Sequence, residues 1–199
     1  MQFRKYNKNV LLKEGNTMAR DIWVVSDTHF NHAGILKFTD INGKPTRGDR
    51  FANVDEMNEA MMDNWNSAVK PGDKVYHLGD VLFGENKLEW ITTNFPKLNG
   101  QKRLIVGNHD NIKMMAQSGV WGKIDMWRMF PEFGLLFTHV PVHESTLKEN
   151  HRWGEGKMLN VHGHIHQNPS PTPNHRCVCV EQINYTPINI EELRIDRDI

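Results

Sequence analysis

The stretch Tyr76-His77-Leu78-Gly79-Asp80 organises the rest of this chain. Residues 74–78 form a short, mostly apolar run that predicts a buried strand, and the strand ends in a glycine and a single carboxylate. A carboxylate has two oxygens, so one aspartate at a strand tip can bind two cations at once. We therefore interpret Asp80 as the bridging ligand of a two-metal hydrolase.

Four further segments place Asp, His or Asn directly after a predicted strand. They are Asp27-Thr28-His29, Gly107-Asn108-His109-Asp110, Thr138-His139 and Gly163-His164-Ile165-His166. Ligands collect beyond the carboxyl ends of strands in open α/β sheets, so we expect the five segments to converge. Imidazole, carboxylate and amide donors without thiolates suit Mn, Fe, Zn, Ni or Co. Taken singly, an Asp capping a helix or a loop with surface histidines explains each segment as well, and only the combination favours metal binding.

Strands and helices alternate along the chain, with more strands in its later part. We predict strands at 22–25, 74–78, 102–106, 124–127, 135–138, 158–162, 177–181 and 186–190, with a hairpin turn at 131–134. Helices are predicted from a cap at Asn53 or Asp55 to about residue 69, at 88–95 and at 114–120, and a polar loop at 40–50. This order indicates an α/β protein with mixed sheets.

The length and composition set further limits. At 199 residues a single domain is expected, with residues 1–20 as a possible extension. Lys plus Arg and Asp plus Glu both number 24, so no broad basic face for stable nucleic-acid binding is expected, although metals would add positive charge. Cys177 and Cys179 are predicted to be reduced structural residues. We find no signal-peptide core or membrane span and expect a cytoplasmic protein with no membrane partner.

From about residue 22 to residue 166, this set of motifs resembles the calcineurin-like metallophosphoesterase superfamily. It is most similar to the small single-domain bacterial and phage members. The resemblance implies a four-layer α/β/β/α sandwich, in which two mixed β-sheets pack face to face and helices flank them. It also implies two divalent metal ions, for which we favour manganese over Fe, Zn, Ni or Co.

Residue roles follow from the same resemblance. It implies that one metal is held by Asp27, His29, Asp80 and His166, and the other by Asp80, Asn108, His139 and His164. His109 matches the catalytic histidine that faces the leaving group, and Asp110 is expected to orient it. Two cations about 3.5–4 Å apart would supply a bridging hydroxide for in-line attack on phosphorus.

The substrate is predicted to be a small phosphodiester or a nucleotide. Protein phosphatases of the superfamily carry Asp-Arg-Gly after the Gly-Asp segment and Glu after Gly-Asn-His. Here Val81-Leu82-Phe83 follows Asp80, and position 110 is Asp. A phosphomonoesterase remains the main alternative, and a non-catalytic scaffold or a nuclease is less favoured. The sequence leaves the oligomeric state open.

Several histidines and one asparagine lie outside the ligand pattern. We consider Asn31, His32 and His143 as possible substrate contacts because they lie near ligands in the sequence. His77 lies inside a predicted strand and is expected to be structural. His162 is expected to pack or to hydrogen-bond behind the ligands.

Overall fold

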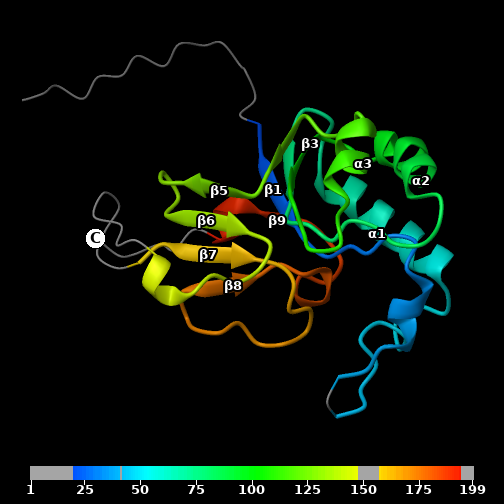
Figure 1. Cartoon of the computed structure of the whole chain (residues 1–199), viewed down its shortest axis with the longest axis horizontal. Helices are drawn as coiled ribbons and strands as arrows, with labels where there is room; N and C mark the ends of the chain where they lie inside the picture. The colour runs from blue at the N-terminus through cyan, green and yellow to red at the C-terminus, as the bar shows by residue number, and fades with distance from the viewer. Residues whose placement is uncertain (1–19, 41, 148–156, 194–199) are drawn as a thin grey trace, which may run out of the picture.

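The computed structural model describes residues 20–40, 42–147 and 157–193, and within these ranges the strands form two sheets (Figure 1). The first sheet has the order β4-β3-β2-β1-β9. Its strands are β1 (Ile22–Val25), β2 (Lys74–His77), β3 (Gln101–Ile105), β4 (Lys123–Asp125) and β9 (Ile188–Asn189). Strands β1 to β4 are parallel and β9 is antiparallel to β1, so the sheet is mixed.

The second sheet has the order β5-β6-β7-β8. Its strands are β5 (Trp127–Phe130), β6 (Leu135–Thr138), β7 (Leu159–His162) and β8 (His175–Cys177). Strands β5 and β6 form the predicted antiparallel hairpin, and β6, β7 and β8 run parallel. The predicted α/β class with two mixed sheets is therefore confirmed.

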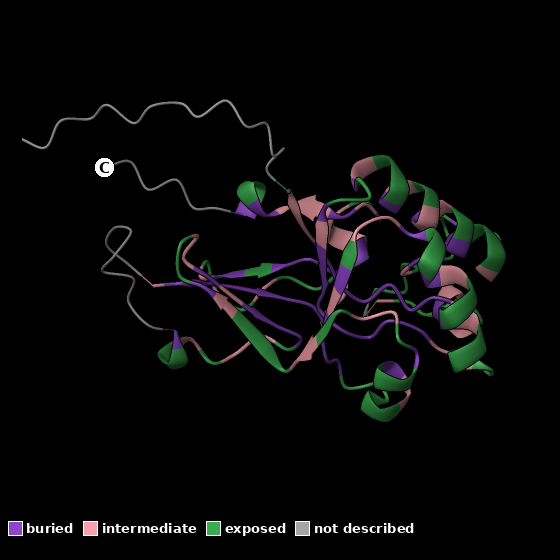
Figure 2. Cartoon of the chain, turned by 90° about the horizontal axis from the view of Figure 1, so that it is seen from above, coloured by how far each residue is buried: buried purple, intermediate pink, exposed green. Residues whose placement is uncertain are grey.

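The two sheets pack face to face through one apolar core. Val24, Tyr76 and Ile105 of the first sheet meet Phe137 and Val161 of the second in a single buried cluster. These residues alternate with outward-facing ones along each strand, as the strand period of two requires. Figure 2 shows the central strands buried and the helices exposed on their outer sides.

The helices are α1 (Val54–Ala68), α2 (Lys87–Asn94), α3 (Ile112–Gln117) and α4 (Ile190–Leu193). Short 3-10 helices are η1 (Ala33–Lys37), η2 (Phe95–Lys97), η3 (Glu144–Thr146) and η4 (Val180–Gln182). Met57, Trp65, Ile91 and Met115 from α1, α2 and α3 pack in one core with the outer face of the first sheet. Asn53 caps α1 by accepting a hydrogen bond from the Glu56 amide, one of the two predicted caps.

Two predicted strands differ from the structure. The run predicted as one strand at 124–127 is divided: β4 ends at Asp125 in the first sheet and β5 begins at Trp127 in the second. The chain thus passes between sheets at Met126. The strand predicted at 177–181 ends at Cys177, because residues 180–182 turn into η4.

Three other expectations concern the ends and cysteines of the chain. The possible extension at 1–20 lies outside the described residues, apart from Arg20. Cys177 and Cys179 are buried free thiols, as predicted. None of the helices in the described ranges has both the length and the apolarity needed to cross a membrane.

Candidate metal centre

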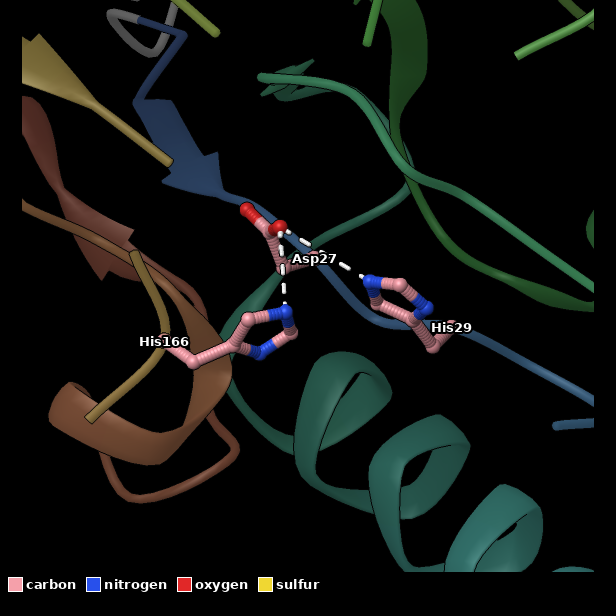
Figure 3. A group of neighbouring side chains, drawn as sticks. All are labelled: Asp27, His29 and His166. Atoms are coloured by element: carbon pink, nitrogen blue, oxygen red, sulfur yellow. Dashed lines mark ion pairs between the residues drawn. The ribbon is translucent and has the colours of Figure 1, made fainter. Parts of the chain in front are cut away.

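The five predicted segments meet where strand ends from both sheets come together. The loops after β1, β2 and β3 approach from the first sheet, and those after β6 and β7 from the second. They form two groups of ligand atoms, each within 4.8 Å of one another: Asp27, His29 and His166 (Figure 3), and Asp80, His139 and His164. The structure therefore brings together residues more than 130 positions apart.

In the first group, one oxygen of Asp27 faces two imidazoles. Asp27 Oδ1 lies 3.7 Å from His29 Nε2 and 3.8 Å from His166 Nε2 (Figure 3). Asp27 Oδ1 and His29 Nε2 are both buried and have no hydrogen-bond partner. The other oxygen, Oδ2, is held by Ser26 Oγ at 2.5 Å, the His164 amide at 2.9 Å and Cys179 Sγ at 3.2 Å.

In the second group, Asn108 joins the charged ligands. Its Oδ1 lies 2.8 Å from His139 Nε2 and 3.0 Å from His164 Nδ1. His139 Nε2 is also 3.5 Å from Asp80 Oδ2. The predicted set of Asp80, Asn108, His139 and His164 is thus gathered around one point.

Asp80 links the two groups through a single oxygen. Oδ2 lies 3.8 Å from His29 Nε2 and 3.5 Å from His139 Nε2. Its other oxygen, Oδ1, accepts a hydrogen bond from the His109 amide at 2.9 Å. Asp80 therefore takes the bridging position, but one oxygen faces both groups, whereas the sequence argument assigned one oxygen to each cation.

The chain matches the family model for calcineurin-like phosphoesterases over residues 20–198. It belongs to the calcineurin-like phosphoesterase family. Members of this family are phosphoesterases that typically use two divalent metals, and the two ligand groups of this chain correspond to such a pair.

The chain is also similar to two curated proteins and to one solved structure. Uncharacterized protein MJ1445 of Methanocaldococcus jannaschii is 33% identical over 179 residues, which cover 86% of this chain and 88% of that protein. Gene 66 protein of Mycobacterium phage L5 is 28% identical over 172 residues, covering 72% and 76% of the two chains. The solved structure of AQ665, a protein of unknown function from Aquifex aeolicus, has a TM-score of 0.64 at 23% identity, covering 88% of this chain and 98% of that chain, and shows likeness of fold alone.

The backbone of this phosphoesterase is strained where the ligands lie. Asp27, His29, Asp80, His164 and His166 all have positive φ, between 47° and 71°. Such left-handed conformations are costly for residues with a Cβ and cluster at functional sites. They turn the chain sharply beyond these strands, so that Asp27 and His29 face one point, whereas His164 and His166 face different ligand groups.

Glycines let the ligand loops touch. A Cβ on Gly79 would overlap the backbone of Gly107, and a Cβ on Gly107 would overlap Asp80. Likewise, a Cβ on Gly163 would overlap Ser26 and Asp27. The glycines of the family motifs are therefore required by close approach of neighbouring loops, across the first sheet and between the two sheets.

Two residues that the sequence did not single out orient a metal ligand. His166 Nδ1 lies 2.9 Å from Glu181 Oε1, which also accepts from Arg47 Nε at 2.8 Å and pairs with Arg47 Nη2 at 2.7 Å. Arg47 is fully buried and donates to the carbonyls of Thr28 and Asp27 at 2.8 and 2.7 Å. No local pattern marks Arg47, since it sits in a polar loop over 130 residues from Glu181.

Other ligand imidazoles also have partners on their far side. His139 Nδ1 lies 2.7 Å from the Leu78 carbonyl, so its Nδ1–H donates there and Nε2 faces the ligands. His29 Nδ1 lies 3.3 Å from His32 Nδ1. These contacts aim the Nε2 lone pairs of His29 and His139 at the metal positions.

Neighbouring charges change the pKa values of the residues in the site. Burial opposes ionisation of Asp27, but the nearby imidazoles of His29, His139 and His166 outweigh it and hold the pKa of Asp27 well below its ordinary value. Burial lowers the pKa of His139, yet the Asp80 and Asp27 carboxylates prevail and raise that pKa to about 9. In the metal-free protein a proton therefore occupies the place where a cation would bind.

The donor set fits a pair of divalent cations. Buried polar groups are nearly always paired, so the two unpartnered atoms Asp27 Oδ1 and His29 Nε2 mark a position for a ligand. Nitrogen and oxygen donors surround that position, as borderline divalent metals prefer. Asp27, His29, Asp80 and His166 would hold one cation, and Asp80, Asn108, His139 and His164 the other.

His109 and Asp110 have separate positions. His109 is exposed, and its ring lies 4.8 Å from that of Phe83 and 6.2 Å from that of His29. Asp110 accepts from the amides of Gly107, Asp80 and Val81 at 2.8, 3.0 and 3.0 Å. The Asp110 carboxylate thus fastens two ligand loops together through their backbones, and its role in orienting the His109 ring stays a prediction.

The three residues predicted to contact substrate, Asn31, His32 and His143, lie in different surroundings. His32 stacks on Phe83 with ring centroids 4.2 Å apart and lies behind His29. Asn31 lines a different hollow, next to residues 85–94. His143 accepts from the Ser145 amide and caps η3, so a structural task accounts for it. Of the three, His32 is the one that the structure brings into contact with a metal ligand.

The two histidines expected to be structural are buried behind the ligand loops. His77 is hydrogen-bonded to Thr28 Oγ1 at 2.9 Å and accepts from the Gly79 amide at 3.2 Å, joining the first two ligand loops. Burial lowers the pKa of His77 to about 3, so this imidazole is neutral. His162 donates from Nδ1 to the Gly163 carbonyl at 2.9 Å.

Proposed function

We propose that this phosphoesterase is a dinuclear metal-dependent phosphodiesterase acting on small phosphodiesters or nucleotides, with manganese as the preferred metal. The observation that carries the proposal is Asp80 Oδ2, which lies between both ligand groups at 3.8 and 3.5 Å from His29 and His139. An oxygen shared by two groups suits a pair of cations acting on one phosphate. The reaction is in-line attack of hydroxide on phosphorus with loss of an alcohol.

Asp80 and His109 have different roles in the proposed reaction. When bound, two divalent cations would neutralise phosphate charge and lower the pKa of water so that hydroxide forms near neutral pH. Asp80, fixed through its Oδ1 by the His109 amide, keeps the two groups in register. The exposed His109 ring is free to donate a proton to the departing oxygen or to stabilise its charge.

The preference for a diester is supported by the charges on the chain. A phosphomonoester dianion is best held by guanidinium or ammonium groups. Arg47 lies beside the first ligand group, but its guanidinium is fully buried and committed to Glu181 and backbone carbonyls. A diester carries one negative charge and needs less neutralisation than a monoester.

Hydrolysis of bis(p-nitrophenyl) phosphate and p-nitrophenyl phosphate tests the proposal. The protein is stripped with chelator and assayed with Mn²⁺, Ni²⁺, Zn²⁺ or Mg²⁺. We expect metal-dependent release from both esters, faster from the diester and fastest with Mn²⁺. Faster release from the monoester would favour a phosphomonoesterase, and no release by protein with bound metal would favour a scaffold.

His109→Ala separates metal binding from chemistry. Because His109 is exposed and its amide, not its ring, holds Asp80, the variant should retain both metals. Turnover of an ester with a poor leaving group should fall about 10²–10⁴-fold. Metal content is measured by elemental analysis and turnover by product release. Equal turnover by the variant on such an ester would contradict the assignment.

A further inference from the structure

An apolar cavity opens beside the second ligand group. Its volume is about 600 Å³, within the range of small-molecule sites. Asn108 and His139 form part of its wall, so the cavity borders the second ligand group. Its remaining lining is Val106, Gly107, Met126, Trp127, Met129, Leu136, Thr138, Val140, Val142 and Thr146.

The cavity lies over the outer face of the β5–β6 hairpin. Along β6, Leu135 and Phe137 point into the core between the sheets, whereas Leu136 and Thr138 line the cavity. On β5, Trp127 and Met129 line it from the same side. Helices α1, α2 and α3 pack on the first sheet, and on this face of the second sheet Val142 and Thr146, from the segment after β6, complete the described wall of the cavity.

The chemistry of the wall selects what can bind there. Among the described residues, no Asp, Glu, Lys or Arg lines the cavity, and the side chains there are mostly aliphatic, aromatic or thioether. A second phosphate or another charged group would lose hydration without gaining an oppositely charged carboxylate, ammonium or guanidinium partner from the described wall. A flat, uncharged ring would bury apolar area and contact Trp127.

The cavity and His109 occupy different sides of the centre. His109 lies near Phe83 and His29, which belong to the side of the first ligand group. The cavity is lined by Asn108 and His139, which belong to the second. A phosphate held between the groups would therefore direct its departing oxygen toward His109 and its remaining substituent toward the cavity.

We propose that this cavity is a binding site for the uncharged aromatic or apolar group that stays on phosphorus when the ester is cleaved. The proposal rests on the proposed function and narrows its substrate class to phosphodiesters with one uncharged aromatic or apolar arm, rather than polyphosphates or long nucleic acids. Trp127 is the specificity-determining residue. Its side chain is 56% exposed on an edge strand, so it is available to a ligand.

A matched pair of substrates tests the proposal. p-Nitrophenyl phenylphosphonate and p-nitrophenyl methylphosphonate share a leaving group and differ in the group that stays on phosphorus. Burial of the phenyl ring should raise kcat/KM about tenfold over the methyl compound, mainly through a lower KM. Trp127→Ala should bring the ratio close to one by slowing the phenyl compound alone. Leu88→Ala, which removes an exposed apolar side chain from α2, should leave the ratio unchanged.

Binding of the products gives a second measurement that does not depend on turnover. Calorimetry with the metal-loaded protein should find phenylphosphonate bound about tenfold more tightly than methylphosphonate. Equal affinities, or a ratio untouched by Trp127→Ala, would overturn the proposal, as would sedimentation showing that this face is covered by a second copy. If neither ester is cleaved, the proposed function fails, while the ratio of product affinities still decides the cavity.

Discussion

At the scale of single residues, the two carboxylate oxygens of Asp80 have different roles. Oδ1 is bound to the His109 amide, and Oδ2 faces imidazoles of both ligand groups. Asp27 is divided in the same way, with three donors on Oδ2 and an unpartnered Oδ1. The anchored oxygen fixes the rotamer, and the other is left for a cation.

Asp27→Asn tests the unpartnered oxygen. Saturating metal at about 100 times Kd should stabilise the wild type by about 2.7 kcal/mol. For a chain of this size that corresponds to a rise in Tm of roughly 5–10 °C. Asp27→Asn should lose most of this rise because the charged ligand of the first group is gone. The exposed Asp63→Asn should keep it, and a full rise in Asp27→Asn would disprove the role.

Glu181→Gln tests the buried chain of contacts from Arg47 to His166. The change keeps the size of the side chain but removes the charge that orients His166 and pairs with Arg47. Loss of such a partner behind a ligand typically lowers metal affinity about 10–100-fold. Calorimetry should show this loss at one of two sites, because His166 belongs to the first group alone.

Glu144→Gln is the matched control for this prediction. Glu144 is also paired with a cation, Lys157, but at the surface and away from both ligand groups. Metal binding should therefore be unchanged in this variant. Equal weakening of both sites in Glu181→Gln would point to a general loss of folding stability instead of a positioning role.

At the scale of elements, the site depends on how the strands end. Five ligands have left-handed backbones, and each lies directly beyond a strand of the parallel part of a sheet. Backbone hydrogen bonds join neighbouring ligand loops, as from the Asp27 amide to the Gly79 carbonyl at 3.0 Å. These bonds and the close glycine contacts offset strain that the isolated segments would not tolerate.

Gly79→Ala tests the close approach of two of these loops. Gly79 has a φ of +96°, and an added Cβ would overlap the Gly107 backbone. Gly119→Ala is the matched control, with a φ of +68° and open space around the new Cβ. The control should cost about 1–2 kcal/mol of unfolding free energy from backbone strain alone. Gly79→Ala should cost more in denaturant titrations and should also weaken metal binding, whereas equal costs would contradict the packing argument.

The division of residues 123–130 between two strands also belongs to this scale. Residues 124–127 read as one strand, yet β4 pairs with β3 in one sheet and β5 with β6 in the other. The pattern of side chains along the sequence shows which residues are apolar. It does not identify the strand with which each backbone segment pairs. Met126 is 64% exposed where the chain leaves one sheet for the other.

Over the whole molecule, the two sheets bring carboxylates and imidazoles together, so metal binding and pH are coupled. In the metal-free protein the pKa of His139 is raised from its ordinary 6.5 to about 9. A raised pKa stabilises the folded state fully below about pH 6.5, and this contribution is lost as the pH rises through 9. A bound cation requires neutral imidazole, so its stabilisation changes with pH in the opposite sense.

The resulting prediction is that the gain in Tm on adding metal grows between pH 6.5 and pH 9. Thermal unfolding with chelator and with metal, at several pH values, measures this gain. Calorimetry in buffers of different ionisation enthalpy should also detect proton release on binding, and less release at higher pH. A gain in Tm that is independent of pH, with no proton release, would show that metal binding does not remove a proton from His139.

The sequence by itself predicted the α/β class, the order of most elements and the residues that the structure gathers in the two ligand groups. It could do so because strand periodicity and short motifs are local, and five motifs in one order are specific when taken together. Only the tertiary structure decided which oxygen of Asp80 faces the ligand groups, that Asp110 binds backbone amides, and that Asn31 lines a separate hollow.

Arg47, Glu181 and the apolar cavity were likewise visible only in the fold. Arg47 and Glu181 meet across 134 positions of sequence, and the cavity joins the loop after β3 to the β5–β6 hairpin. Neither residue carries a motif. Their functions arise from burial and proximity, which depend on how the two sheets pack and not on the identity of neighbours along the chain.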